Sequence, residues 1–299
     1  MPLDTAPDIE AAGQSAVAER PLPKARSDAP FVAGLCIIGG FYVLFIAAMV
    51  LADMAYTTPG RMKLALQSPA IRYSIRLSLL SCTLSTIFSL WVAVPLGYML
   101  SRYQAPAGRS GWWAWLFKGV VDAVLDIPIV LPPLVVGLSL LILFHTAAGR
   151  QIERVFPVTY AIPSVIVAQF AVACAFAVRT MKVSFDQINP RSEQVALTLG
   201  CSRSQAFWMV VLPEARHGML AAGTLAWARA LGEFGPILVF SGATRFRTEV
   251  LPTSVYLEVS VGNLESAVAV SLLMIAVAVL VLVVVRLSGA DTAVGRAGT

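Results

Sequence analysis

The chain has 299 residues, of which 58% are apolar and 13% are charged, and its formal net charge is +5. Apolar surface left in water costs about 25 cal/mol per Å², so this composition excludes a soluble globular protein and predicts a membrane protein. The positive charge does not require nucleic acid as a partner, because the sequence has no basic run with interleaved aromatic residues of the kind that grips a strand.

Several segments have the roughly 20 apolar residues that a helix needs to cross a bilayer. We count six: Phe31–Asp53, Tyr73–Ser101, Val120–His145, Ala161–Thr180, Met219–Ser241 and Ser266–Arg286. The first segment follows a polar tail and is too long for the apolar core of a cleaved signal peptide, so we interpret it as a retained anchor. The expected fold class is an all-α, polytopic membrane protein with about six transmembrane helices.

The predicted organisation has three parts. Residues 1–30 are rich in Pro and Ala, with scattered charges and no apolar period, which predicts a disordered tail. Residues 31–287 form the transmembrane domain, and residues 288–299 form a C-terminal tail. Lys and Arg gather in the segments that face the cytoplasm when both termini are inside, so the positive-inside rule predicts this orientation.

Two of the predicted spans contain residues that interrupt helices. The third has Pro128, Pro132 and Pro133, and the fifth has Gly232, Gly235 and Pro236. A helix-interior proline removes a main-chain hydrogen bond, and irregular backbone is tolerated in a bilayer only where it faces protein or water. These two spans are therefore the candidates for lining a path through the membrane, with Pro132, Pro133 and Gly235 on it. Kinks that serve packing alone are the alternative.

Arg229 and Glu233 are the most deeply placed charges of the predicted spans. A helix brings residues four apart onto one face, and an isolated charge at this depth would cost about 2.5 to 3.5 kcal/mol. We therefore expect an ion pair. The pair either holds helices or two copies of the chain together, or lies on the path, where Arg229 would attract a passing anion and Glu233 would keep binding weak.

A polar-edged loop, Gln194–Pro213, separates two of the apolar segments. Just before it, Asn189 and Pro190 offer an N-cap and a first-turn proline. Gly200 is suited to a left-handed C-terminal cap, because it has no Cβ. A first short helix is predicted between these signals.

A second short helix should follow directly. Ser202 with Gln205 has the form of a capping box, and Leu212-Pro213 is expected to end the helix. Two short helices at an angle set by the glycine would form a surface for a partner. An ordinary helical hairpin between two spans is the alternative.

This loop resembles the cytoplasmic coupling loop of ABC transporter permeases of the binding-protein-dependent importer class. The family pattern is Glu-Ala-Ala, three residues, Gly, nine residues, Ile, one residue, Leu-Pro. The residues at the matching spacing are Ala196, Gly200, Val210, Leu212 and Pro213.

The first turn departs from the family pattern. Gln194 stands where the family has Glu, Val195 stands where it has Ala, and Glu193 comes one place early. Within a coupling loop at about residues 182–217, the resemblance implies that the ATPase docks on Glu193, Gln194, Ala196, Gly200, Leu212 and Pro213.

Three further stretches are similar to the molybdate and sulfate branch of this family. They are DIPIVLPPLVVG from Asp126, ARALGEFGPILVFSG from Ala228 and NLESAVAVSLLMI from Asn263. The resemblance implies a type I ABC importer permease fold in the inner membrane of a bacterial or archaeal cell. It also implies that the chain forms the translocation path for an oxyanion, with molybdate as the expected substrate and tungstate and sulfate as alternatives.

The resemblance supplies the expected partners as well. These are a cytoplasmic ATP-binding subunit in two copies, a second permease that is either the same chain or a related one, and an extracytoplasmic binding protein. The sequence has no GxxxxGK[ST] motif, so ATP and Mg²⁺ are expected on the partner ATPase, and this chain is expected to be neither an enzyme nor a cofactor protein. The four cysteines and two histidines have no metal-site spacing.

Two other classes of function compete with an importer subunit. A membrane-embedded enzyme would need a catalytic set, but Asp122 and Asp126 lie four apart on one helix, whereas intramembrane aspartyl proteases draw their two carboxylates from different helices. We therefore reject the enzyme. An ion-coupled secondary transporter would share the kinked helices and buried charges, but it would have no use for a docking loop. It is kept as the alternative.

Overall fold

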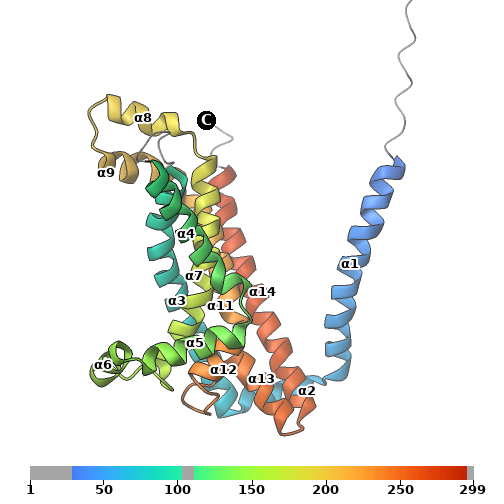
Figure 1. Cartoon of the computed structure of the whole chain (residues 1–299). Helices are drawn as coiled ribbons and strands as arrows, with labels where there is room; N and C mark the ends of the chain where they lie inside the picture. Colours follow the sequence, from blue (N-terminus) through green and yellow to red (C-terminus); the bar gives the residue numbers. More distant parts are fainter. Residues whose placement is uncertain (1–28, 103–110, 295–299) are drawn as a thin grey trace, which may run out of the picture. The chain divides into compact units, whose positions relative to one another are not determined.

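A computed structural model describes residues 29–102 and 111–294 of the chain, and these residues form helices joined by turns (Figure 1). The predicted N-terminal tail lies outside the described residues except for its last two. The chain divides into two units, residues 1–51 and 52–299, which are described separately. Most of helix α1 (Ala29–Tyr56) belongs to the first unit, and its apolar length confirms the first predicted span.

The second unit contains the remaining described helices. Up to the loop they are α2 (Pro59–Gln67), α3 (Pro69–Arg102), α4 (Gly111–Val130), α5 (Pro133–His145), α6 (Ala147–Val155) and α7 (Ile162–Gln187). The loop carries α8 (Pro190–Thr198), α9 (Arg203–Ala206), a π-helical turn η1 (Phe207–Val211) and α10 (Leu212–Glu214). The last helices are α11 (Arg216–Leu231), α12 (Gly235–Phe240), α13 (Leu251–Ser260) and α14 (Leu264–Val294).

Small residues allow the core helices of this unit to approach one another closely. Helix α3 packs against α7 and α11, and its buried face includes five serines at helical spacing: Ser74, Ser78, Ser81, Ser85 and Ser89. A Cβ added at Gly97 would lie 2.8 Å from the Met181 Cβ of α7. Small-residue faces of this kind are typical of helix packing inside membranes.

Hydroxyl groups of the same face connect α3 to α13. The Leu251 amide donates to Ser78 Oγ at 2.8 Å, and Ser254 Oγ lies 2.9 Å from Ser74 Oγ, within hydrogen-bond distance. These bonds lie at the end of the unit that carries α2, α6 and α13, which we call the far end; α8 and α9 mark the loop end (Figure 1).

The expected six spans are not all continuous helices, and the count of six is not confirmed. Four described helices are long and apolar enough to cross a membrane, and α4 with α5 makes a fifth candidate that is bent by 115°. The predicted span Met219–Ser241 is divided between α11 and α12 at Gly232–Phe234, where Gly232, Gly235 and Pro236 predicted an interruption. Gly232 caps the end of α11, and Pro236, which has no amide hydrogen to donate, lies in the first turn of α12.

The interruption predicted for the third span is present at Pro132 and Pro133 but not at Pro128. Pro128 lies inside α4, and the bend comes after Val130, where two adjacent prolines cannot both continue a helix and Pro133 starts α5. Helix α14 runs past the predicted boundary at residue 287 to Val294. Residues 295–299 of the predicted tail lie outside the described part.

Candidate functional site: the loop and the broken helices

The first half of the loop has the predicted backbone. The Asn189 side chain caps α8 by accepting a hydrogen bond from the Arg191 amide at 3.0 Å, with Pro190 in the first turn. Gly200 has a φ of +93°, in the left-handed region that favours glycine. Its amide donates to the Leu197 carbonyl at 3.1 Å. The expected cap at Gly200 is confirmed.

The second half of the loop begins as predicted, but it does not end where predicted. Ser202 Oγ accepts from the Gln205 amide at 3.2 Å, and Gln205 Oε1 accepts from the Ser202 amide at 2.8 Å, which completes the capping box. The prediction that Leu212-Pro213 ends this helix is wrong, because helical backbone continues through η1 and α10 towards α11. Pro213 is tolerated because it lies in the first turn of α10, after the π-helical turn.

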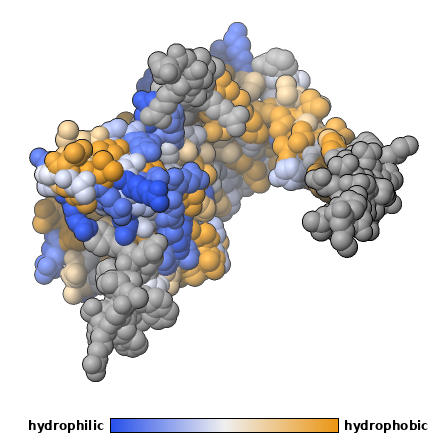
Figure 2. Space-filling model, turned by 90° about the horizontal axis from the view of Figure 1, so that it is seen from above, coloured by the Kyte–Doolittle hydropathy of each residue, from blue (hydrophilic) through white to orange (hydrophobic). Residues whose placement is uncertain are grey.

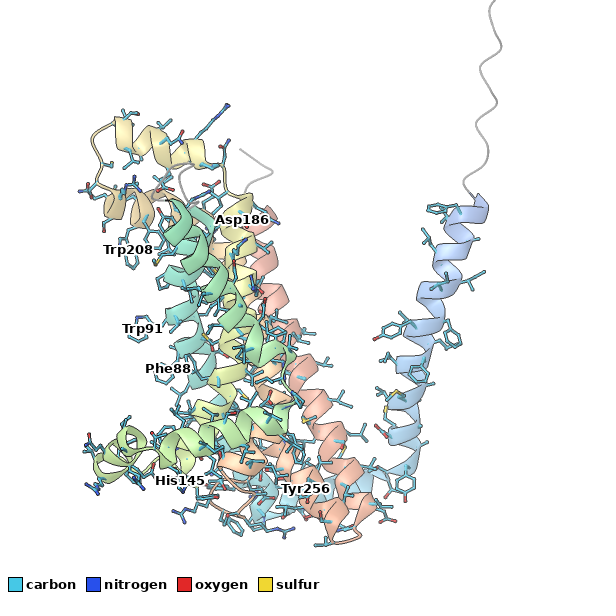
Figure 3. All side chains as sticks on the ribbon, viewed as in Figure 1. Phe88, Trp91, His145, Asp186, Trp208 and Tyr256 are labelled. Carbon is cyan, nitrogen blue, oxygen red and sulfur yellow. The ribbon has the colours of Figure 1, made fainter. Side chains whose placement is uncertain are left out.

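Large apolar side chains of the loop are exposed. The exposed fractions are 80% for Leu199, 71% for Met209, 64% for Trp208 and 56% for Val195, and we call these four the apolar loop residues. Trp208 points away from the helices in Figure 3, and the view onto the loop end in Figure 2 shows hydrophobic and hydrophilic surface side by side. Exposed apolar residues in a group with polar surroundings are typical of a docking surface.

The residues predicted for docking differ in how far they can be reached. Gln194, Gly200 and Pro213 are exposed, Leu212 is half-buried, and Ala196 is buried. The Cys201 amide donates to the Ala196 carbonyl at 3.1 Å, so Ala196 serves the packing inside the loop and only its neighbours are open to a partner.

Glu193 points towards α3. Its Oε1 accepts a hydrogen bond from the Tyr98 hydroxyl at 2.5 Å, and its Oε2 lies 3.4 Å from Arg102 Nε. The side chains of Arg102 and Glu193 are each 12% exposed. Tyr98 and Arg102 were not predicted as site residues. They stand at the end of α3, far from the loop in sequence, and no local pattern indicates the contact.

The bend between α4 and α5 and the break between α11 and α12 meet at one cavity of about 290 Å³. Its lining contains all five residues predicted for the path: Pro132, Pro133, Arg229, Glu233 and Gly235. The structure thus brings these five residues together, and their role on a path through the membrane stays a prediction.

Two glycines bring the broken elements into contact beside this cavity. A Cβ added at Gly235 would lie 2.8 Å from Pro133 Cβ and 3.0 Å from the Leu134 amide nitrogen. A Cβ added at Gly137 of α5 would lie 2.8 Å from the Pro236 Cα of α12. Contacts this short to backbone leave no room for a side chain, so the shape of the cavity depends on both glycines.

The expected ion pair between Arg229 and Glu233 is present. The Glu233 side chain is 1% exposed, whereas the Arg229 side chain is 30% exposed. The guanidinium carbon also lies 5.6 Å from the centre of the Phe176 ring of α7, within the range of a cation–π contact. The cavity is thus lined by a buried carboxylate and a partly open cation.

A second charged group joins α4 to α7. Arg179 Nη1 lies 2.9 Å from Asp122 Oδ1, and Arg179 Nη2 lies 2.6 Å from Asp126 Oδ1. Asp122 and Asp126, which were considered above as a catalytic set, therefore bind one arginine of a neighbouring helix. The spacing of the two aspartates was visible in the sequence, but their common partner was not.

Apolar helices of membrane-spanning length, two broken elements around a charged cavity, and a loop with exposed apolar residues together define a multi-pass membrane transport protein. Residues 93–292 match the family described as the binding-protein-dependent transport system inner membrane component. The chain belongs to this family. It is the membrane-spanning permease subunit of an ABC importer, and thus a transport subunit that is separate from the ATPase.

Curated relatives agree with this assignment. A probable molybdenum ABC transporter permease protein of Haloferax volcanii is 32% identical over 244 residues, 81% of this chain and 82% of the relative. The molybdate/tungstate transport system permease protein WtpB of Pyrococcus furiosus is 33% identical over 68% of this chain and 74% of the relative. The sulfate transport system permease protein CysT of Escherichia coli is 30% identical over 68% of this chain and 71% of the relative.

Solved structures show the same fold at low sequence identity. A bacterial ABC transporter involved in the import of the acidic polysaccharide alginate has a TM-score of 0.69 at 16% identity, covering 88% of this chain and 96% of that chain. The MetNI methionine ABC transporter has a TM-score of 0.57 at 16% identity, covering 78% and 100%. The expected type I importer permease fold agrees with these neighbours.

Proposed function

We propose that this permease imports a tetrahedral oxyanion, with molybdate as the substrate and tungstate or sulfate as the alternatives. The relatives named above for molybdenum, molybdate/tungstate and sulfate transport support this class. The observation that carries the proposal is the partly open Arg229 guanidinium on the cavity between the broken helices. Arg is suited to oxyanion recognition, and its Glu233 partner keeps the site weak enough for passage.

We infer further that the loop end docks a cytoplasmic ATPase and that both termini lie in the cytoplasm. The apolar loop residues support this inference, because they are exposed on a segment that leaves the helical bundle. ATP and Mg²⁺ then bind to two copies of that partner.

A second permease copy and a binding protein complete the proposed importer. Partly exposed charges such as Arg229 and Arg179 must face protein or water inside a bilayer, and the facing surface of an identical copy would provide both. One neighbouring solved structure is a bacterial alginate ABC transporter in complex with a pentasaccharide-bound periplasmic protein. By analogy, an oxyanion-binding protein would dock at the far end of this chain.

Reconstitution tests the proposal directly. The permease is placed in proteoliposomes with the ATPase and binding protein encoded beside it, and uptake of molybdate, tungstate and sulfate is measured. Uptake that requires ATP and survives collapse of proton and sodium gradients is expected. Uptake that follows an ion gradient without ATP would instead identify a secondary transporter. Calorimetric titration of the binding protein with the three anions ranks the substrates.

A further inference from the structure

One residue of the loop faces the opposite way from a docking residue. Glu193 lies in the first turn of α8, where a carboxylate is favoured by the helix dipole. Its two oxygens are directed to Tyr98 and Arg102 of α3, at 2.5 and 3.4 Å. Arg102 Nη2 also donates to the carbonyl of Ile188 at 3.0 Å, just before α8 begins.

Tyr98 contacts the second half of the loop with its ring. The ring centroid lies 4.8 Å from that of Phe207 in η1, at an interplanar angle of 62°. It lies 5.7 Å from that of Phe185, near the end of α7. One side chain of α3 therefore meets both halves of the loop and the helix that leads into it.

The base of this contact is closely packed. Gly97 precedes Tyr98, and at this point α3 and α7 are so close that an added Cβ would lie 2.8 Å from Met181 Cβ. The backbone next to Tyr98 therefore lies directly against α7. A displacement of α8 has a direct route into α3, in addition to the covalent connection of α8 to α7 at Ile188–Asn189.

We propose that Tyr98, Arg102 and Glu193 form a brace that carries movements of the loop into α3. These are positioning residues, and the brace rests on the proposed docking of an ATPase on the loop. The apolar loop residues receive the partner, while Glu193 transmits the push inward through its ion pair with Arg102 and its charge-assisted hydrogen bond from Tyr98, which is stronger than a neutral one. The departure of the first turn from the family pattern, with Glu193 one place early, fits this inward role.

The test compares Glu193→Gln and Tyr98→Phe with wild type in the reconstituted importer. Tyr98→Phe keeps the ring contacts and removes only the hydroxyl. Both variants are expected to hydrolyse ATP in response to the binding protein, while the number of oxyanions taken up per ATP falls by about tenfold, the factor that corresponds to losing one charge-assisted hydrogen bond. In the double variant, uptake per ATP should fall no further than in the more impaired single variant, because both changes affect the same contact.

Glu214→Gln is the matched control, since Glu214 is an exposed acid of the same loop, and its uptake per ATP should remain that of wild type. An unchanged ratio in both brace variants would overturn the proposal. A parallel loss of hydrolysis and uptake would also overturn it, because it would mean that the loop is merely misplaced.

A separate variant distinguishes failure of the brace from failure of the docking site. Leu199→Asp places a charge on the exposed residue that directly follows α8, away from the brace, and should prevent co-purification of the ATPase. If Leu199→Asp leaves the complex intact, the loop is not the docking site and the proposed function of the loop fails. If Leu199→Asp dissociates the complex while the brace variants transport normally, docking stands and the brace alone is refuted.

Discussion

Gly200 sets the course of the loop by its backbone alone. Its φ of +93° disfavours any Cβ, and no neighbouring atom lies within 4 Å of the position where a Cβ would be. Gly200→Val should therefore cost about 1 kcal/mol or more through strain rather than collision. We expect the protein to insert normally while ATP hydrolysis becomes uncoupled from uptake. Gly60→Val, in open space without a positive φ, is the control; normal coupled uptake by Gly200→Val would refute this role.

The Arg229–Glu233 pair can be separated into a structural and a transport role. Arg229→Ala alone should lower the yield of folded complex, because it leaves the 1% exposed Glu233 side chain without its counter-charge. The double change to alanine should restore assembly. On the path proposed here, the double variant hydrolyses ATP but does not transport the oxyanion. Wild-type uptake by the double variant would restrict the pair to a structural role.

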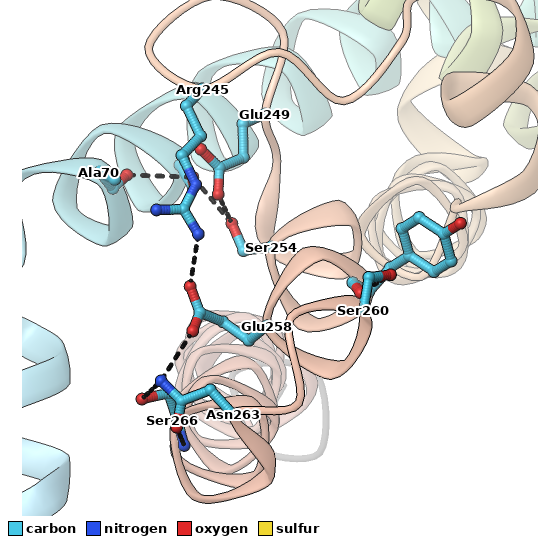
Figure 4. A network of polar contacts seen from close by, with 10 residues as sticks. Ala70, Arg245, Glu249, Ser254, Glu258, Ser260, Asn263 and Ser266 are labelled. Carbon is cyan, nitrogen blue, oxygen red and sulfur yellow. Dashed lines mark hydrogen bonds and ion pairs between the residues drawn. The ribbon is translucent and has the colours of Figure 1, made fainter.

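Glu249 gives the far end a dependence on pH. It lies outside the spanning segments and is buried, with Oε1 accepting from Ser254 Oγ at 2.8 Å (Figure 4). Burial raises the pKa of the Glu249 carboxyl above its ordinary value; the Ser254 hydroxyl and Arg245 offset only part of this rise, and Glu258 adds to it. Between the ordinary and the raised pKa, the folded state holds a proton that the unfolded state has lost.

Folding stability should therefore fall as pH rises through this window. We expect the unfolding midpoint of the detergent-solubilised protein to decrease from mildly acidic to neutral pH. Glu249→Gln keeps an uncharged acceptor for Ser254 and should flatten the slope of the unfolding midpoint against pH. Glu214→Gln should leave this slope as it is in wild type. An equal slope in wild type and Glu249→Gln would exclude Glu249 as its source.

At the scale of elements, the contact between α5 and α12 depends on glycine. The Cβ of Gly235→Ala would meet Pro133 Cβ at 2.8 Å and the Leu134 amide nitrogen at 3.0 Å, so backbone would have to shift. Overpacking of this kind typically costs about 1–3 kcal/mol, which should appear as a lower unfolding midpoint. Gly232→Ala is the matched control, because its nearest neighbours would be 3.8 Å away. Equal midpoints for the two variants would contradict the tight contact.

Local signals predicted those elements whose cause is local. Asn189 and Gly200 bounded α8, and the capping box at Ser202 began α9, because each is defined by main-chain bonds within a few residues. The same reasoning failed at Pro213. A proline in a new first turn and a proline that ends a helix are identical in sequence, and only the preceding π-helical turn distinguishes them.

One side-chain contact was predicted because the membrane requires it. A charge within a span needs a partner, so the spacing of Arg229 and Glu233 predicted their ion pair. Tyr98 with Glu193, and Arg179 with the two aspartates, join residues of different helices. A single sequence does not reveal which helix faces pack together, and these contacts therefore required the structure.

At the scale of the whole molecule, apolar composition predicted the membrane and the helical class, while the count of six spans is not confirmed. Hydropathy averages over a window and does not register a bend such as the 115° between α4 and α5, which the prolines of the third segment predicted. The breaks place two charged residues at one open cavity, so the interruptions that shorten the helices also create the site.

The orientation proposed for the second unit in the membrane rests on the charge bias and can be tested with its own thiol. Cys201 lies in the loop and is partly exposed, whereas Cys82 and Cys174 are buried, so Cys36→Ser leaves one reactive cysteine in the described chain. With the loop end in the cytoplasm, a membrane-impermeant maleimide should label Cys201 only after the membrane is opened. Gln151→Cys in a background with Cys201→Ser provides the converse control, because Gln151 is exposed on α6 at the far end and should react in intact spheroplasts. Labelling of Cys201 from outside would reverse the orientation and remove the loop from the reach of a cytoplasmic ATPase.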